Sequence, residues 1–159
     1  MGDFKSSTPR YQIYLFFLFH MLFFGVSGFA LAYAVERCPV LFLYLHGGSA
    51  LFGYTIFYLY IFGADEIKWM FINAGLGVLG IYTQVGWLLS FYGKKIGDYP
   101  LSVHVIPFLY YVFYTFLLRQ ALLDITGARD NAARRELVHR VYVGVSLTVS
   151  LVSFWLAPR

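Results

Sequence analysis

Charged residues are scarce in this chain. Only 13% of its 159 residues are Asp, Glu, Lys or Arg, which is about half the share found in soluble domains. Hydrophobic residues make up 60% and aromatic residues 21%. This composition excludes an ordinary soluble domain and indicates a membrane protein. The length suits one helical bundle without a sizeable soluble domain.

Cysteine is nearly absent as well. The single cysteine, Cys38, excludes an intrachain disulfide framework, a Cys-x-x-Cys redox pair and a cysteine-based zinc site. No pair of carboxylates lies within one apolar stretch, so nothing supports a carboxylate proton relay. The net charge of +4 is carried mostly by termini and loops. This positive charge is therefore expected to set the orientation of the chain in the membrane and to contact lipid headgroups, and nucleic acid is excluded as a partner.

Long apolar stretches make up most of the sequence. About 20 apolar residues cross a ~30 Å hydrocarbon layer as a helix. We predict an all-α polytopic membrane protein, with one transmembrane domain over residues 1–159 and about five transmembrane helices in a single bundle. The predicted spans are residues 11–34, 40–62, 67–92, 101–125 and 137–157. Pro107 is expected to kink the fourth span near one end.

Five spans place the two termini on opposite sides of the lipid bilayer. The N-terminal side collects these basic residues: Lys5, Arg10, Lys68, Arg129, Arg134, Arg135 and Arg140. The other side collects Arg37, Lys94, Lys95 and Arg159. The positive-inside rule then predicts a bacterial inner membrane protein with a cytoplasmic N-terminus, although Lys94 and Lys95 argue against it.

A glycine-rich segment lies in the third span. Residues 75–80 fit the pattern G-x-G-x-x-G, but they sit inside an apolar helix and not between a strand and a helix, so we reject a nucleotide site. Asn73, Gly77, Gly80 and Gln84 form one small and polar stripe, which is typical of a helix–helix contact. We expect other membrane subunits to bind through this span, and a quinone or lipid-headgroup cleft is the alternative.

The four histidines lie in four different spans. At 1.5 Å per residue, His46 and His104 lie roughly 9 Å and 5 Å below the outer ends of their spans, whereas His20 and His139 belong to the inner half. Two levels of histidines suit two bis-histidine haems b stacked across a bundle. We therefore predict these four residues as iron ligands, although a roughly 13 Å mismatch in depth separates His20 from His139.

Residues beside the histidines extend this haem hypothesis. Small residues follow His46 on its own helix face, Gly53 among them, and would leave room for a macrocycle. Arg140 is predicted to pair with a propionate of the inner haem. A tightly packed neighbouring helix needs the same small residues, and an intramembrane histidine also serves as a hydrogen-bond donor between helices. Both alternatives stay open.

A family resemblance rests on the last two spans. His139-Arg140 is followed by Gly144 and a long apolar run, after a span that bears His104 and ends in residues 118–122, LRQAL. This arrangement resembles bacterial multi-pass families with a His-Arg helix start. The wider pattern is similar to the four-helix di-haem b-type cytochromes of the ascorbate and ferric-reductase type. The resemblance implies histidine-ligated haem and gives the third span no role.

Three functions follow from these observations. The first is transmembrane electron transfer by a b-type haem-binding subunit, with a quinone as a candidate partner. The second is a non-catalytic structural or assembly subunit of a larger membrane complex. The third is a small transporter or lipid-handling protein, in which Asn73, Gln84 and a kink at Pro107 surround a cavity. No feature of the sequence indicates a soluble enzyme.

Overall fold

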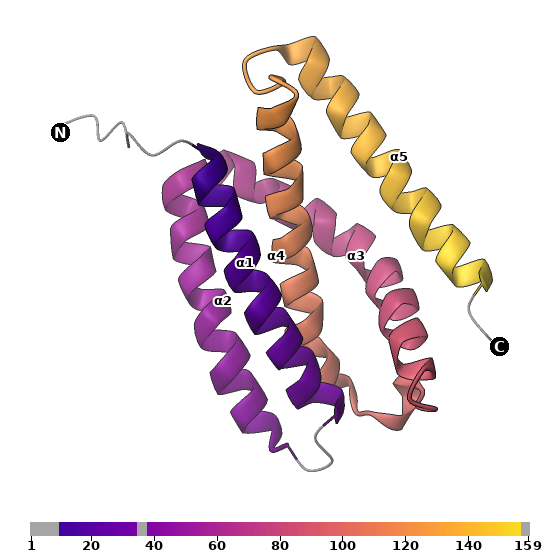
Figure 1. The fold of residues 1–159 in the computed structure, drawn as a ribbon. Coiled ribbons are helices and arrows are strands. Elements are labelled where there is room, and N and C mark those ends of the chain that lie inside the picture. Colours follow the sequence, from indigo (N-terminus) through magenta and orange to yellow (C-terminus); the bar gives the residue numbers. More distant parts are fainter. Residues whose placement is uncertain (1–9, 35–37, 157–159) are drawn as a thin grey trace.

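The computed structural model describes residues 10–34 and 38–156, and every regular element in this part of the chain is a helix (Figure 1). The five α-helices are α1 (Arg10–Phe29), α2 (Val40–Phe62), α3 (Ala64–Ser90), α4 (Leu101–Ile125) and α5 (Ala132–Leu156). A π-helical turn, η1 (Ala30–Ala34), extends α1, and a 3₁₀ turn, η2 (Ile96–Asp98), precedes α4. The prediction of an all-α bundle is confirmed.

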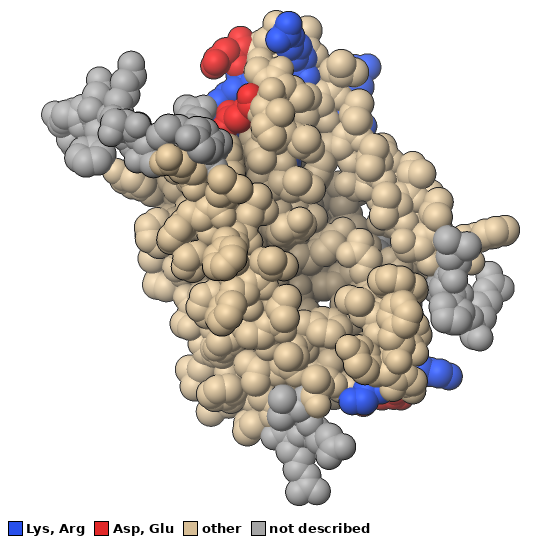
Figure 2. Space-filling view, in the orientation of Figure 1, with Lys and Arg blue, Asp and Glu red and all other residues tan. Residues whose placement is uncertain are grey.

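The helices are long and apolar enough to cross a membrane. Helices α1, α2, α4 and α5 each qualify alone, and α3 qualifies as a fifth span when its two arms are counted together. On the face shown in Figure 2, charged side chains gather at the two ends and leave an uncharged middle. Such a band matches the hydrocarbon layer of a bilayer, and the protein is an integral membrane bundle.

Helix boundaries agree with the predicted spans best where proline precedes the helix. Helices α2 and α4 cover the predicted residues 40–62 and 101–125. Helix α3 begins at Ala64 instead of residue 67, because Asp65 and Glu66 lie in its first turn, where negative charge favours a helix. Helix α5 begins at Ala132 instead of residue 137. Lys5, Arg37 and Arg159, used above for orientation, lie outside the described residues.

Helix α4 is the centre of the bundle. It contacts each of the other four α-helices and lies between the pair α1–α2 and the pair α3–α5 (Figure 1). The side chains of Phe116, Leu117, Arg119 and Leu123 are fully buried. An arginine is therefore part of the interior of a membrane protein, which requires partners for its charge.

Helix α2 packs on the bundle through one face. Its buried residues recur every three or four positions, namely Leu43, Gly47, Leu51, Tyr54 and Tyr58, which places them in one stripe. At Gly47, an added Cβ would lie 2.3 Å from Cγ2 of Ile106 on α4. Only glycine therefore allows this close approach of α2 to α4.

Helix α3 is bent. Its arms, Ala64–Val78 and Gly80–Ser90, meet at 48°, whereas α4 is helical without interruption through Pro107. The second arm of α3 diverges from α1 and α4 in Figure 1. The face of the molecule seen in Figure 2 is hollowed in this region, which is where the cavities described below lie.

Candidate functional site

The two predicted outer histidines bind different neighbours. Nε2 of His46 lies 3.1 Å from the hydroxyl of Ser27 on α1. That hydroxyl donates its single proton to the carbonyl of Phe24 at 3.0 Å, so the bond to His46 is consistent with a proton on Nε2. Nδ1 of His104 lies 2.8 Å from the hydroxyl of Tyr33 in η1. The structure thus connects His46 to α1 and His104 to the end of the π-turn.

The two predicted inner histidines also lie in separate surroundings. Nδ1 of His20 is 3.1 Å from the carbonyl oxygen of Phe16, one turn earlier in α1. Nε2 of His139 is 2.7 Å from Nη2 of Arg119 on α4, and its ring lies 4.2 Å from the ring of Trp69 on α3. His20 is therefore bonded within its own helix, and His139 is part of a contact between three helices.

These partners do not fit bis-histidine haem ligation as the rings stand. A b-type haem iron takes a nitrogen lone pair from each of two facing imidazoles, yet Nε2 of His46 and of His139 is occupied by Ser27 and by Arg119. Among residues 10–34 and 38–156, no group of three or more His, Cys, Asp or Glu side chains is placed to hold a metal ion. Haem binding stays a prediction that an absorption spectrum tests.

The two other predicted haem-binding residues have simple surroundings. Within 4 Å of a Cβ added at Gly53 there is only open space. Arg140 donates from Nε to Glu136 one turn earlier at 2.9 Å, and both side chains of this pair are largely exposed. The ion pair of Arg140 is therefore made within α5.

The stripe on α3 packs inside the bundle. A Cβ added at Gly77 or Gly80 would meet the ring or the hydroxyl of Tyr111 on α4, at 3.1 and 2.7 Å. Oδ1 of Asn73 accepts a hydrogen bond of 3.2 Å from Tyr142 on α5, and Gln84 is hydrogen-bonded to Tyr111. The expected helix–helix contact is therefore present, and it is made within the chain. Binding of other subunits through this span stays a prediction.

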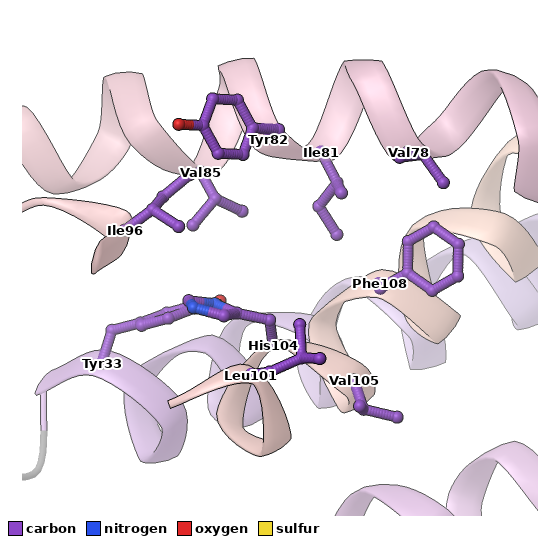
Figure 3. A pocket seen from close by; sticks show the side chains of 10 residues that line it. All are labelled: Tyr33, Val78, Ile81, Tyr82, Val85, Ile96, Leu101, His104, Val105 and Phe108. Carbon is purple, nitrogen blue, oxygen red and sulfur yellow. The ribbon is translucent and has the colours of Figure 1, made fainter. Parts of the chain in front are cut away.

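Two cavities adjoin each other beside the second arm of α3. The first, here called the His104 cavity, has a volume of about 350 Å³. Tyr33 and His104 form one wall, opposite Ile81 and Val85 of α3 (Figure 3). The remaining lining residues are apolar except for Tyr82. The volume is in the range of small-molecule sites.

The second cavity, here called the Tyr110 cavity, has a volume of about 420 Å³. Helices α1, α3 and α4 line it, and Ile81 and Val85 belong to both cavities. Of the three residues that the lipid-handling hypothesis placed around a cavity, Gln84 and Pro107 lie in this wall. Asn73 does not, because it is bonded to Tyr142.

The hydrogen bonds at the end of α1 fix one wall of the His104 cavity. The carbonyl oxygen of Tyr33 accepts two bonds, from Nζ of Lys94 at 3.1 Å and from the hydroxyl of Tyr99 at 2.9 Å. A helix end leaves such carbonyls without intrahelical partners, and the loop between α3 and α4 supplies the missing donors. The Tyr33–His104 pair is thereby held in place.

A buried charged cluster lies at the opposite end of the bundle. We call Glu66, Trp69, Arg119, Gln120 and His139 the Arg119 cluster. Nη1 of Arg119 donates to Glu66 at 2.8 Å, and the guanidinium lies 4.0 Å from the centre of the Trp69 ring. Nε2 of Gln120 donates to the same Glu66 oxygen at 2.9 Å. Nε of Arg119 has no partner among the described residues.

The α4–α5 loop continues this network. Arg129 donates to the side-chain oxygen of Gln120 at 3.0 Å, and both Arg129 and Tyr14 are hydrogen-bonded to Asp124. Burial lowers the pKa of Arg129, but the hydrogen bond and charge of Asp124 outweigh that effect and hold its pKa above the usual value. The loop guanidinium is therefore charged and ties α1 to α4.

The Arg119 cluster was not predicted from the sequence, although one signal was available. Arg119 and Gln120 interrupt an apolar span, and an ionisable residue inside a span requires a named partner. Glu66 falls between the predicted spans 40–62 and 67–92, where a carboxylate needs no partner. We interpret the cluster as structural, because its side chains bind one another across α3, α4 and α5.

Comparisons with protein-family models, with curated proteins and with solved structures found no match for this chain. Its function is therefore argued from the cavities and their walls.

Proposed function

We propose that the protein binds an elongated, membrane-soluble molecule in the two adjoining cavities between α1, α3 and α4. Of the three functions considered above, this corresponds to lipid handling. The observation that carries the proposal is the Tyr110 cavity, whose volume of about 420 Å³ is lined mostly by apolar side chains within the membrane-spanning part of the bundle.

The shape of the bundle supports this proposal. An apolar cavity in a soluble protein excludes water, but a cavity beside lipid is accessible to any apolar chain dissolved in the bilayer. The 48° bend of α3 separates its second arm from α1 and α4, and the two cavities share Ile81 and Val85. We therefore propose that the ligand extends along both cavities.

Gly25 on α1 allows the proposal to be tested. It lines the Tyr110 cavity, and a Cβ added there meets nothing within 4 Å. The Gly25→Leu variant therefore adds a bulky side chain to the cavity wall at a position where the Cβ meets no neighbour, and leucine also favours the helix. Gly144→Leu is a matched control, because Gly144 is on α5, is exposed and is also free of neighbours within 4 Å.

The experiment uses purified protein in vesicles of phosphatidylcholine that carries a diazirine at the end of one acyl chain. We expect irradiation to give adducts on Met21 and Tyr110, which line the cavity and are only 3% and 6% exposed. Phe23, which is 67% exposed, reports contact with the surrounding bilayer. Gly25→Leu should remove the two buried adducts and retain the one on Phe23, while Gly144→Leu retains all three. Equal buried adducts in the two variants would refute the proposal.

We also propose that the protein resides in a bacterial inner membrane with its N-terminus in the cytoplasm. Basic residues near the α2–α3 turn and in the α4–α5 region outnumber those in the α3–α4 loop, which supports this orientation. In a Cys38→Ser background, Gly97→Cys should react with a membrane-impermeant maleimide added to cells with a permeabilised outer membrane. Asp130→Cys should react only after the inner membrane is opened. The reverse pattern contradicts this orientation.

A further inference from the structure

One apolar side chain of the loop between α3 and α4 belongs to the wall of the His104 cavity. This residue is Ile96 in η2, whereas the other lining residues come from α3, α4 and η1. In Figure 3, Ile96 lies toward one end of the cavity and Phe108 toward the other. The sequence neighbours Lys95 and Gly97 are exposed, but Ile96 is partly buried. Ile96 therefore lies between the cavity and the exposed part of the loop.

The lining residues show that this end of the cavity is an end of the bundle. On α3 they run from Val78 to Val85, and on α4 they run back from Phe108 to Leu101. Leu101 is the first residue of α4 and is 82% exposed. The loop that precedes it carries two lysines and one aspartate, which belong in water and not in hydrocarbon. Ile96 is therefore at the boundary between an apolar space and water.

Local contacts hold Ile96 at this boundary. The backbone N–H of Lys95 donates to the carboxylate of Asp98 at 2.7 Å, and the backbone N–H of Tyr99 donates to the carbonyl of Ile96 at 3.2 Å. Cδ1 of Ile96 lies 3.4 Å from the position of a Cβ added at Gly86 on α3. The side chain thus extends from the loop to the backbone of α3.

We infer that the Ile96 side chain closes the His104 cavity against water at this end of the bundle, so that ligands enter the cavity from the bilayer. The hollowed face in Figure 2, which lies in the uncharged middle of the molecule, is the corresponding entrance from lipid. Ile96 then restricts the site to membrane-soluble molecules. As a statement about ligands, this inference rests on the proposed function.

The reactivity of a buried thiol measures access from each side. In a Cys38→Ser background, Val85→Cys places a thiol in the cavity wall at a position that is only 7% exposed. The purified protein is placed in lipid nanodiscs, which expose both ends of the bundle to water. Two methanethiosulfonates are compared, a neutral methyl reagent that dissolves in lipid and a trimethylammonium-ethyl reagent that stays in water. Each rate is divided by the rate at Gly97→Cys, an exposed loop position, and the charged-to-neutral ratio is the readout.

With Ile96 in place, we expect a ratio of about 0.1 or less, because a charged group is costly to bring into an apolar space. Ile96→Ala should raise this ratio by about tenfold, whereas Ile96→Leu keeps the side-chain volume and should leave it low. Ile81→Ala is the matched control, because it removes the same atoms from the middle of the wall (Figure 3), and it should not change the ratio. A high ratio with Ile96 in place, or an unchanged ratio in Ile96→Ala, would overturn the inference.

A second thiol separates local opening from loss of the fold. Leu51→Cys lies on α2, is outside the lining of the cavity and is only 5% exposed. It should stay unreactive toward the charged reagent in Ile96→Ala. If it became as reactive as Val85→Cys, Ile96 would stabilise the fold without closing the cavity, and the inference would be overturned. Failure of the proposed function has a different signature, because Gly25→Leu would then retain the buried diazirine adducts while the thiol ratios stay as expected here.

Discussion

Glu66→Gln isolates the charge balance of the Arg119 cluster. The change keeps an oxygen near Arg119 and Gln120 but removes the carboxylate that compensates a fully buried guanidinium. Removing one partner of a buried ion pair costs about 3–5 kcal/mol. Because the Glu66 side chain retains 21% exposure, we expect a value near the lower end, about 3 kcal/mol of unfolding free energy.

A double-mutant cycle measures the coupling directly. Arg119→Met removes the charge and keeps an apolar side chain of similar length, and we expect the pair Glu66→Gln/Arg119→Met to recover at least half of the stability lost in Glu66→Gln. Replacement of a buried ion pair by apolar side chains is often neutral or stabilising by about 1–4 kcal/mol. Unfolding in mixed micelles with increasing dodecyl sulfate, followed by circular dichroism, gives the free energies.

Arg140→Met is the control for this cycle. Its ion pair with Glu136 is similar in length, 2.9 Å, but both side chains are 60% or more exposed, and such pairs contribute about 0–1 kcal/mol. If Glu66→Gln costs no more than Arg140→Met, then Arg119 is not held in the interior by Glu66. This result would refute our interpretation that the Arg119 cluster holds α3, α4 and α5 together.

Three further predictions concern packing, hydrogen bonding and haem. Gly47→Ala should cost about 1–3 kcal/mol by overpacking against Ile106, and Gly48→Ala, with open space around its Cβ position, should cost nothing; thermal unfolding compares the two. Tyr142→Phe removes a hydroxyl that lies 3.2 Å from both Oδ1 of Asn73 and the carbonyl oxygen of Thr115 and should cost about 1 kcal/mol in the micelle assay, whereas an unchanged stability would mean that neither bond stabilises the fold. A dithionite-reduced absorption spectrum of the purified protein tests haem binding: a sharp α-band is the result expected of a b-type haem, and a colourless, fully folded preparation would contradict the electron-transfer hypothesis.

The sequence predicted the position of helices along the chain better than the direction of their side chains. The bounds of α2 and α4 followed from apolar length and from a preceding proline. The places of His46 in α2 and of His104 in α4 also followed from the sequence. Their rings nevertheless bind Ser27 and Tyr33, because ring direction depends on the rotation of each helix about its axis.

Ion-pair partners that are far apart in the sequence could not be predicted either. Arg119 and Glu66 are 53 positions apart, and only the packing of α3 on α4 brings them together. By contrast, the stripe of Asn73, Gly77 and Gly80 was predictable as a helix contact, because its spacing alone places these residues on one face. The sequence did not reveal that the contacting residue is Tyr111.

The order of Glu66 and Arg119 along the chain has a consequence for biosynthesis. On insertion scales an arginine at the centre of a membrane-spanning helix is opposed by about 2.5–3.5 kcal/mol, and Arg119 lies six residues before the C-terminal end of α4. Helix α3 leaves the ribosome before α4, so the carboxylate is already available when the guanidinium enters. Helix α5 comes last and adds His139 to a charge that is already neutralised. The carboxylate that pairs with Arg119 is therefore synthesised before the arginine itself.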